Sequence, residues 1–338
     1  MMDAKQAAAN AIQAVLEGKP GESLLVVTDD VRSEVGETFA QGGLELGLWT
    51  RLLVLETEED VYRKSVPPHL VEIANSPNPP DIYINTLRGP AQETPFRIQI
   101  IKLETRKRRS RLGHCPGITM DMLTEGALAL TTEEHAKMQS EAESLLAKIQ
   151  DSVSVHVTSP SGSDFTLNVR GRKWFTDTKL NWRDMKWMNL PTGEVLVGPV
   201  ETQGEGKLVS DLAIGGIGPI DSNFTIEFEN GKVKDTDCGD DEALRIVRET
   251  QDTDEMAKHV GEFAFGLNPK ARLVEEFLES EKLGNAIHVA FGNNMDYPGE
   301  TANNSGTHQD FLVDEPTVVV KLNDGTELTV MKDGKLQV

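Results

Sequence analysis

Two histidines and an aspartate near the end of the sequence have the types and spacing of metal ligands. His308 and Asp310 stand two residues apart, and His288 precedes His308 by twenty residues. Residues two apart on a β-strand point to the same face, so His308 and Asp310 predict two donors on one strand. An imidazole from a neighbouring strand, that of His288, would bring two nitrogens and a carboxylate to one point. This is the outline of a metal site.

Two glutamates extend the set of possible donors. Glu194 opens a predicted strand after a turn that contains proline and glycine, and Glu262 lies within an otherwise apolar segment. Each donor has an ordinary structural alternative. The two glutamates suit edge strands that face solvent, His288 suits a hydrogen-bonded core histidine, and Asp310 suits a turn cap. The spacing of His308 and Asp310 beside a strand histidine favours the metal site.

Composition excludes several classes of function. The 338 residues carry 34 basic and 55 acidic side chains, a net charge of −21. Such a surface repels nucleic acid and anionic membranes. The sequence shows neither a long apolar segment nor a secretory signal, and its two cysteines form no disulfide framework. We therefore expect a cytoplasmic protein that binds neither nucleic acid nor membrane. A small molecule or short peptide as its substrate is implied by the family resemblance described below.

Two further features carry alternative interpretations. The segment 101–111 is basic, with Lys102, Arg106, Lys107, Arg108, Arg109 and Arg111 against a single acid, Glu104. This segment is either a site for an anionic group or a solvated face or subunit contact. The second interpretation is favoured, because runs of charged residues are usually solvated. The pair His114-Cys115 is interpreted as part of a turn before a helix capped by Thr119, and much less readily as a nucleophile or ligand pair.

The first half of the chain alternates strands and helices. Apolar periodicity predicts helices over 3–17 and 32–48 and short strands over 23–28, 51–55 and 81–85. This order is typical of a βαβ unit with an open, mostly parallel sheet. No glycine-rich dinucleotide motif follows the first strand. A charged helix over 132–150 completes an α/β domain that we expect to span residues 1–150.

The second half is rich in strands. Period-two alternation and turn residues predict strands near 153–157, 165–169, 195–197, 208–209, 224–228 and 232–234, and a helix over 239–258. Asn230-Gly231 predicts a hairpin turn, and His156 is expected on the solvent side of its strand. These elements predict a strand-rich α+β domain over 151–338 that contains the metal-binding residues.

Several segments resemble the aminopeptidase T/aminopeptidase S family of metallopeptidases. They are Asn-Leu-Pro-Thr-Gly-Glu-Val at 189–195, Gly-Glu-Phe-Ala-Phe-Gly-Leu-Asn-Pro at 261–269, His-Val-Ala-Phe-Gly-Asn-Asn at 288–294, Gly-Thr-His-Gln-Asp at 306–310 and Pro-Gly-Ile-Thr at 116–119. The resemblance implies an α/β domain followed by a metal-binding domain, and commonly a homodimer. It also implies that the metal ligands are Glu194, Glu262, His288, His308 and Asp310, with Glu262 bridging two ions or positioning water.

The sequence departs from this family at two positions. The peptidases have a further ligand glutamate where this chain has Leu283, and a catalytic tyrosine where it has Met295, although Tyr297 is close. Glu281 would replace the missing glutamate only if the loop differed by two residues. A leucine cannot bind a cation, so a two-metal mechanism is put in question.

Three functions follow from the resemblance. The first is a hydrolase of the aminopeptidase type that uses zinc, cobalt or manganese, with Glu262 and Tyr297 as catalytic residues. The second is a ring-cleaving dioxygenase with one iron(II), as in the similar 2,5-dihydroxypyridine dioxygenase branch. That branch has histidine in place of Glu262. The third is a non-catalytic relative.

Overall fold

The computed structural model describes residues 2–106, 109–183 and 185–337, which fold into two compact units. The first unit contains the chain up to Lys137 together with Asp177–Thr192, and the second contains Met138–Thr176 and the chain from Gly193 onward. The segment 177–192 belongs to the first unit because its strand pairs with that unit's sheet. A domain boundary at residue 150 stays a prediction.

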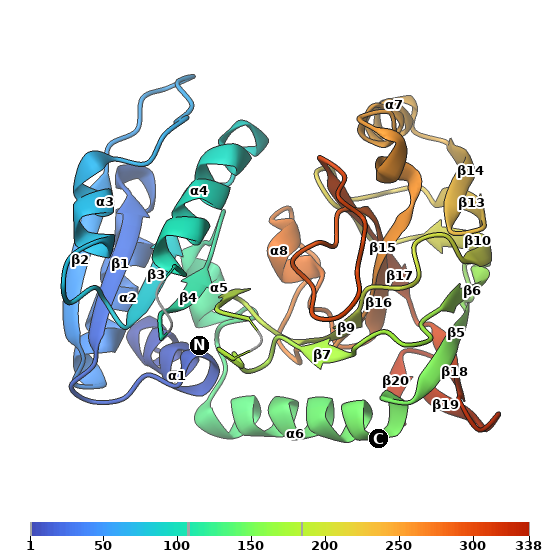
Figure 1. Cartoon of the computed structure of the whole chain (residues 1–338), viewed down its shortest axis with the longest axis horizontal. Helices are drawn as coiled ribbons and strands as arrows, with labels where there is room; N and C mark the ends of the chain where they lie inside the picture. Colours follow the sequence, from blue (N-terminus) through green and yellow to red (C-terminus); the bar gives the residue numbers. More distant parts are fainter. Residues whose placement is uncertain (1, 107–108, 184, 338) are drawn as a thin grey trace. The chain divides into compact units, whose positions relative to one another are not determined.

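The first unit is an open parallel sheet with helices (Figure 1). In its described residues the sheet has the strand order β2-β1-β3-β4-β8. The elements are α1 (Ala4–Leu16), β1 (Ser23–Asp29), α2 (Ser33–Glu45), β2 (Trp49–Leu55), α3 (Pro68–Ala74), β3 (Ile82–Thr86), α4 (Thr94–Glu104), β4 (Arg111–His114), α5 (Met120–Thr124) and β8 (Trp187–Asn189), with short 3-10 turns at Asp30–Arg32 and Ala91–Glu93. Helix α6 (Thr132–Ile149) runs from this unit into the second.

Both faces of the parallel sheet are buried at strand β1. Leu24 and Val26 of β1 pack in one core with α1, α2 and α5, while Leu25 and Val27 pack in another with α3 and α4. This explains why β1 is a continuous apolar run, as expected for a parallel strand covered on both sides. The predicted helices and strands over residues 3–55 and the strand near 81–85 are confirmed within a few residues.

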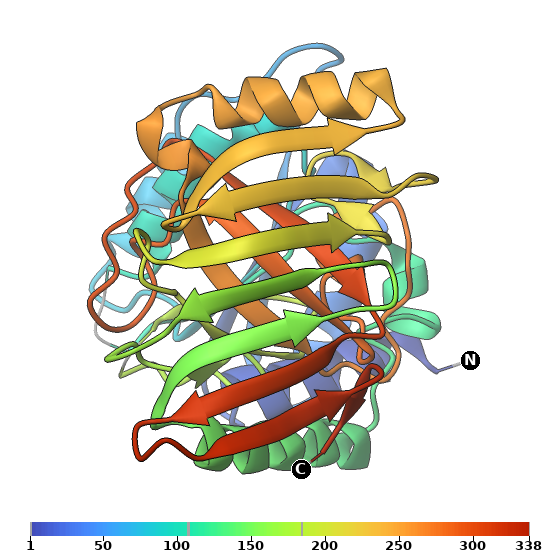
Figure 2. The same ribbon diagram turned by 90° about the vertical axis from the view of Figure 1, so that its right-hand side faces the viewer.

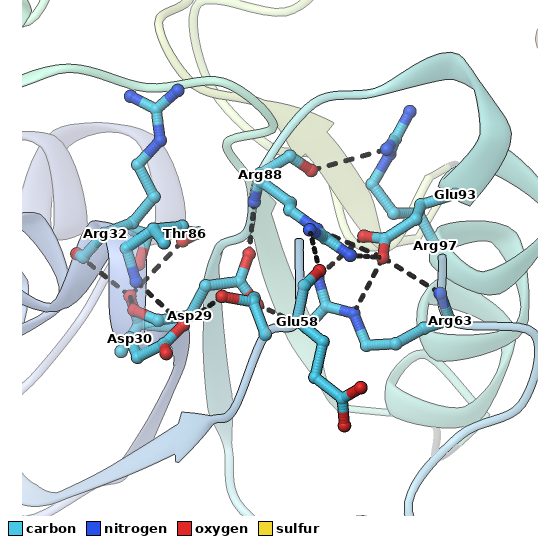
Figure 3. A network of polar contacts seen from close by, with 12 residues as sticks. Asp29, Asp30, Arg32, Glu58, Arg63, Thr86, Arg88, Glu93 and Arg97 are labelled. Carbon is cyan, nitrogen blue, oxygen red and sulfur yellow. Dashed lines mark hydrogen bonds and ion pairs between the residues drawn. The ribbon is translucent and has the colours of Figure 1, made fainter. Parts of the chain in front are cut away.

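A polar network lies where β1 and β3 end (Figure 3). The buried carboxylate of Asp29 contacts Arg63 and the backbone N–H of Arg88. Both arginines also contact the buried carboxylate of Glu93, and this lowers the pKa of Glu93 to about 2 although burial opposes its ionisation. The network therefore links the segments that follow β1 and β3, and we assign it a structural role.

The second unit contains two antiparallel sheets (Figures 1 and 2). Among the described residues one sheet has the order β14-β13-β10-β6-β5-β18-β19-β20, and the other β12-β11-β17-β16-β15-β9-β7. The elements are β5 (Ser152–Thr158), β6 (Asp164–Asn168), β7 (Phe175–Thr176), β9 (Glu194–Val197), β10 (Gly204–Ser210), β11 (Ala213–Ile214), β12 (Gly218–Pro219), β13 (Phe224–Glu229), β14 (Lys232–Cys238), α7 (Asp241–Gln251), a 3-10 turn (Glu255–Lys258), β15 (Val260–Gly266), α8 (Phe277–Ser280), β16 (Ala286–Gly292), β17 (His308–Asp314), β18 (Thr317–Leu322), β19 (Glu327–Lys332) and β20 (Lys335–Leu336).

Aromatic side chains fill the space between these two sheets. Phe228 of the first sheet meets Phe291 of the second with ring centroids 5.9 Å apart, and Phe224 meets Phe311 at 5.8 Å. All four rings are buried. Since side chains alternate along a strand, the opposite face of the second sheet is free to carry polar residues.

Some local predictions need correction. The expected helix over 239–258 is a helix over Asp241–Gln251 followed by a 3-10 turn. Thr119 is the N-cap residue of α5, but its hydroxyl contacts the side chain of Asp121 rather than capping a backbone N–H. His156 lies on the solvent side as predicted, 2.8 Å from Asp164.

In the described part of the chain, no helix is long and apolar enough to cross a bilayer.

Candidate metal centre

In the second unit, one sheet has the order β12-β11-β17-β16-β15-β9-β7. Its four adjacent strands β17, β16, β15 and β9 place the predicted donors on one face. Register aligns Glu262 of β15 with Ala290 of β16, and Ala290 in turn with Asp310 of β17. His288 lies two residues before Ala290, so its side chain is on the same face. Glu194 begins β9 on the other side of β15. The alternative that Glu194 and Glu262 are edge-strand carboxylates is wrong, because both are buried in inner strands.

The five side chains converge, with nitrogen-to-oxygen distances between 3.2 and 3.9 Å. His288 Nε2 lies 3.3 Å from Glu262 Oε1, 3.5 Å from Glu194 Oε1 and 3.9 Å from Asp310 Oδ1. His308 Nε2 lies 3.2 Å from Glu262 Oε2 and 3.3 Å from Asp310 Oδ1. The structure therefore brings together every residue that the sequence predicted as a ligand.

Burial and charge shift the pKa values of these groups. Burial disfavours ionisation of Glu262, but hydrogen bonds from His288 and His308 outweigh it and lower the pKa of this carboxyl. Burial likewise disfavours charged His288, yet Glu262, Glu194 and Asp310 raise its pKa to about 9. The pKa of His308 is also raised well above its ordinary value, against the effect of burial, by Asp310 and Glu262. The carboxylates thus attract positive charge to this point.

The orientation of His308 suits metal binding. Its Nδ1 lies 2.8 Å from the carbonyl oxygen of Asn293, which can only accept a hydrogen bond. This contact keeps the proton of a neutral ring on Nδ1 and leaves the Nε2 lone pair directed at the carboxylates. Asn293 also donates to the carbonyl of Ser305 at 2.7 Å, which closes the base of the loop between β16 and β17.

The loop between β16 and β17 supplies a tyrosine to the site. The Tyr297 hydroxyl donates a hydrogen bond to Glu262 Oε2, and its ring packs edge-on against Phe175. Burial, together with the negative charge of Glu262, raises the pKa of Tyr297 well above its ordinary value, so the hydroxyl keeps its proton. Met295, at the position of the family's tyrosine, is 52% exposed.

A buried ion pair that the sequence did not indicate holds this loop. Arg172 Nη2 lies 2.5 Å from Glu201 Oε2. Glu201 also accepts hydrogen bonds from Asn294 Nδ2 at 3.0 Å and from the backbone of Ala302 at 2.8 Å. Glu201 follows β9, whereas its partners come from distant segments, so no local spacing connects them.

The connection between α8 and β16 also reaches the site, which the sequence did not predict. Lys282 Nζ lies 2.5 Å from Glu194 Oε2 and 2.7 Å from Glu281 Oε1. Burial raises the pKa of Glu281, and Asp310 adds to this increase. Leu283, at the position of the family's glutamate, is only half-buried. The acid nearest this position is therefore Glu281.

Among the described residues, the other candidates do not converge on a common site. His114 and Cys115 are buried, and burial lowers the pKa of His114 to about 3 and raises that of the Cys115 thiol. Both groups are thus neutral core residues. In the basic segment, Arg111 is buried and pairs with Glu22 at 2.6 Å, and Arg106 and Arg109 are exposed. Lys107 and Arg108 lie outside the described residues.

A comparison with known families decides the family of this chain. The sequence profile described as thermophilic metalloprotease (M29) matches residues 127–336, which is more than half of the chain. The chain belongs to the M29 metalloprotease family. Membership of M29 implies a hydrolase with a divalent metal, and the matched range contains all five predicted ligands.

Individual proteins resemble this M29 chain over different extents. It is 29% identical to aminopeptidase AmpS of Bacillus subtilis over an alignment of 172 residues, which covers 45% of this chain and 41% of that relative. The match thus spans less than half of the relative's length. AmpT of Thermus thermophilus shares its fold, with a TM-score of 0.70, 19% identity and 99% of both chains covered.

A second solved structure shows that this M29 fold also occurs in an oxygenase. The 2,5-dihydroxypyridine dioxygenase of Pseudomonas putida KT2440 has a TM-score of 0.71 and 16% identity over 98% of this chain and 96% of that chain. At such identities the likeness concerns the fold alone. The mixed α/β architecture predicted from the sequence is confirmed by these matches.

The residues of this M29 chain fit a divalent ion. Glu262, His288 and Asp310 each offer a ligand atom, and these atoms lie within 4.8 Å of one another. His288 Nδ1 is buried and has no hydrogen-bond partner among the described residues, so the contacts of Nε2 orient the ring. Carboxylate and imidazole donors in this combination suit zinc, cobalt, manganese or iron(II).

Proposed function

We propose that this chain is a metal-dependent hydrolase of the aminopeptidase type that acts on a small peptide or amide. The observation that carries this proposal is the convergence of Glu262, His288, His308 and Asp310 on one sheet face, with a tyrosine hydroxyl beside them. Family membership supports the class of reaction. The cytoplasmic location and the homodimer remain predictions.

In this proposal His288, His308 and Asp310 would hold the ion, and Glu262 beside them would be the general base. A divalent ion held there would supply a Lewis acid for a substrate carbonyl and would lower the pKa of a bound water toward neutrality. The charged imidazoles that lower the pKa of Glu262 would be neutral as ligands. The ion would replace their positive charge, so Glu262 would stay ionised and could accept a proton from water. Tyr297, which keeps its proton, would shift its single O–H donor from Glu262 to the negative charge that develops on the substrate oxygen.

The test is turnover of aminoacyl anilides and small amides by protein supplied with zinc, cobalt or manganese. Glu262→Gln should lower kcat by roughly 10²–10⁴-fold, the usual contribution of a general base. Glu249→Gln, at an exposed site on α7, is the matched control and should leave kcat unchanged. An absence of turnover with all three metals in folded protein would refute the proposal.

A ring-cleaving dioxygenase is the second candidate. The observation in its favour is the group His288, His308 and Asp310, two imidazoles and a carboxylate, which is the arrangement of many iron(II) oxygenases. The fold likeness to the Pseudomonas putida enzyme agrees with this. Glu262 opposes it, because its carboxylate faces the same point. Oxygen uptake with a dihydroxylated aromatic and iron(II), but with no other metal, would favour this candidate.

A further inference from the structure

A buried lysine stands between two carboxylates at the edge of the candidate metal centre. The side chain of Lys282 is 3% exposed, and its Nζ is 2.5 Å from Glu194 and 2.7 Å from Glu281. Lysine is almost never fully buried unless it is paired. Here the ammonium is held by two acids, and one of them, Glu194, also lies 3.5 Å from His288 Nε2.

Backbone contacts fix this lysine in place. The N–H of Lys282 donates to the carbonyl of Glu279 at 3.1 Å, and its carbonyl accepts from the N–H of Asn268 at 2.9 Å. Gly266 aligns with Glu194 across the strands, and a Cβ at Gly266 would lie 2.0 Å from the carbonyl oxygen of Leu283. Because glycine occupies this position, the 281–283 segment approaches β15 closely enough to bring Lys282 to Glu194.

The donors divide into two groups around this lysine. Glu262, His288, His308 and Asp310 surround one point. Glu194 and Glu281 would remain as two hard oxygen donors for a second divalent ion. Their carboxylates already neutralise the ammonium of Lys282, and a fixed positive charge a few ångströms away repels a divalent ion strongly in a poorly hydrated site.

We propose that Lys282 takes the place of a second metal ion, so that this chain binds one divalent ion. The inference rests on the proposed function only in requiring that the centre binds metal. It assigns Glu194 mainly to Lys282 and leaves His288, His308 and Asp310 as the ligands of the single ion, with Glu262 beside it as the proposed base. The substrate carbonyl and the attacking water would then share one Lewis acid.

The test is the number of manganese(II) ions bound per full-length chain, measured by equilibrium dialysis with elemental analysis. Wild-type protein should bind one ion, and its paramagnetic resonance spectrum should lack coupling between neighbouring manganese ions. Lys282→Ala removes the charge and opens space, so it should bind two ions with a coupled spectrum. Lys282→Arg keeps the charge and should bind one.

Two ions in the wild-type protein, or one ion in folded Lys282→Ala, would overturn the inference. If Lys282→Ala does not fold, Lys282→Gln serves instead, because it removes the charge while its amide can still donate hydrogen bonds to the two acids. One bound ion without peptidase turnover contradicts the hydrolase and leaves the inference standing. No bound ion in the wild-type protein contradicts both.

Discussion

The hydroxyl of Tyr297 donates a hydrogen bond to Glu262, which joins the loop between β16 and β17 to the centre of strand β15. Met295, which the resemblance assigns to the family's tyrosine position, is 52% exposed. The site therefore has a tyrosine hydroxyl, supplied from two residues further along the chain. Its contact with the candidate general base makes it the most direct probe of catalysis.

Tyr297→Phe should lower kcat by roughly 10²-fold, the usual loss when one hydrogen-bond donor to a developing negative charge is removed. KM and the number of bound metal ions should change little, because the phenyl ring keeps its packing against Phe175. Met295→Ala is the control and should behave as the wild type. Equal activity of Tyr297→Phe and wild type would show that this hydroxyl takes no part in catalysis.

Metal binding should strengthen as pH rises from about 6.5 to about 9. The pKa of His288 is raised from 6.5 to about 9, so without metal its protonated form stabilises the fold below pH 6.5 and this stabilisation is lost toward pH 9. A metal ion needs neutral imidazoles and must displace these protons. The metal-induced rise in Tm should therefore increase over this range.

Calorimetric titration in buffers of different ionisation enthalpy measures directly the protons that metal binding displaces from the histidines. Binding of zinc at pH 7 should release protons, and the release should fall when His308 is replaced by alanine. A metal-induced rise in Tm that stays constant between pH 6.5 and 9 would contradict the assignment of these histidines.

The ion pair of Arg172 with Glu201 should matter for both stability and activity. Glu201→Gln should lower the free energy of unfolding by about 2 kcal/mol, because a charged hydrogen bond to buried Arg172 is lost. It should also lower kcat, since Glu201 holds the loop that carries Tyr297. Glu205→Gln, on an exposed carboxylate of β10, should change stability by less than about 0.5 kcal/mol. Equal effects of the two substitutions would argue against this role.

Gly266→Ala should displace the segment that carries Lys282. The added Cβ would lie 2.0 Å from the carbonyl oxygen of Leu283, so β15 and this segment must separate. We expect a lower Tm and weaker metal binding, measured by thermal unfolding and equilibrium dialysis. The control is Gly239→Ala, whose nearest neighbour lies at 4.0 Å. Unchanged metal affinity in Gly266→Ala would show that the placement of Lys282 does not influence the centre.

The sequence was informative where side-chain periodicity decides the structure. The same-face rule places His308 with Asp310, and the apolar strand around His288 places a second imidazole beside them, as observed. Strand β1 was equally clear because a buried parallel strand is a continuous apolar run. These features depend on residues that are neighbours within one strand or on adjacent strands.

The features that the sequence did not predict depend on long-range contacts. Lys282 lies in an irregular connection, and its position is set by the close approach of that connection to Gly266. Glu201 acts through partners that are distant in sequence. Strand β4 escaped prediction because its four residues include Arg111 and His114, which are polar yet buried. No local pattern encodes such contacts.

The central claim, that one centre is built from Glu262, His288, His308 and Asp310, is tested most directly by anomalous diffraction from crystals grown with manganese or zinc. The account predicts one anomalous peak bonded to the Nε2 atoms of both histidines and to at least one of the two carboxylates. No peak at saturating metal, or a peak that lacks contact with His288 and His308, would contradict it.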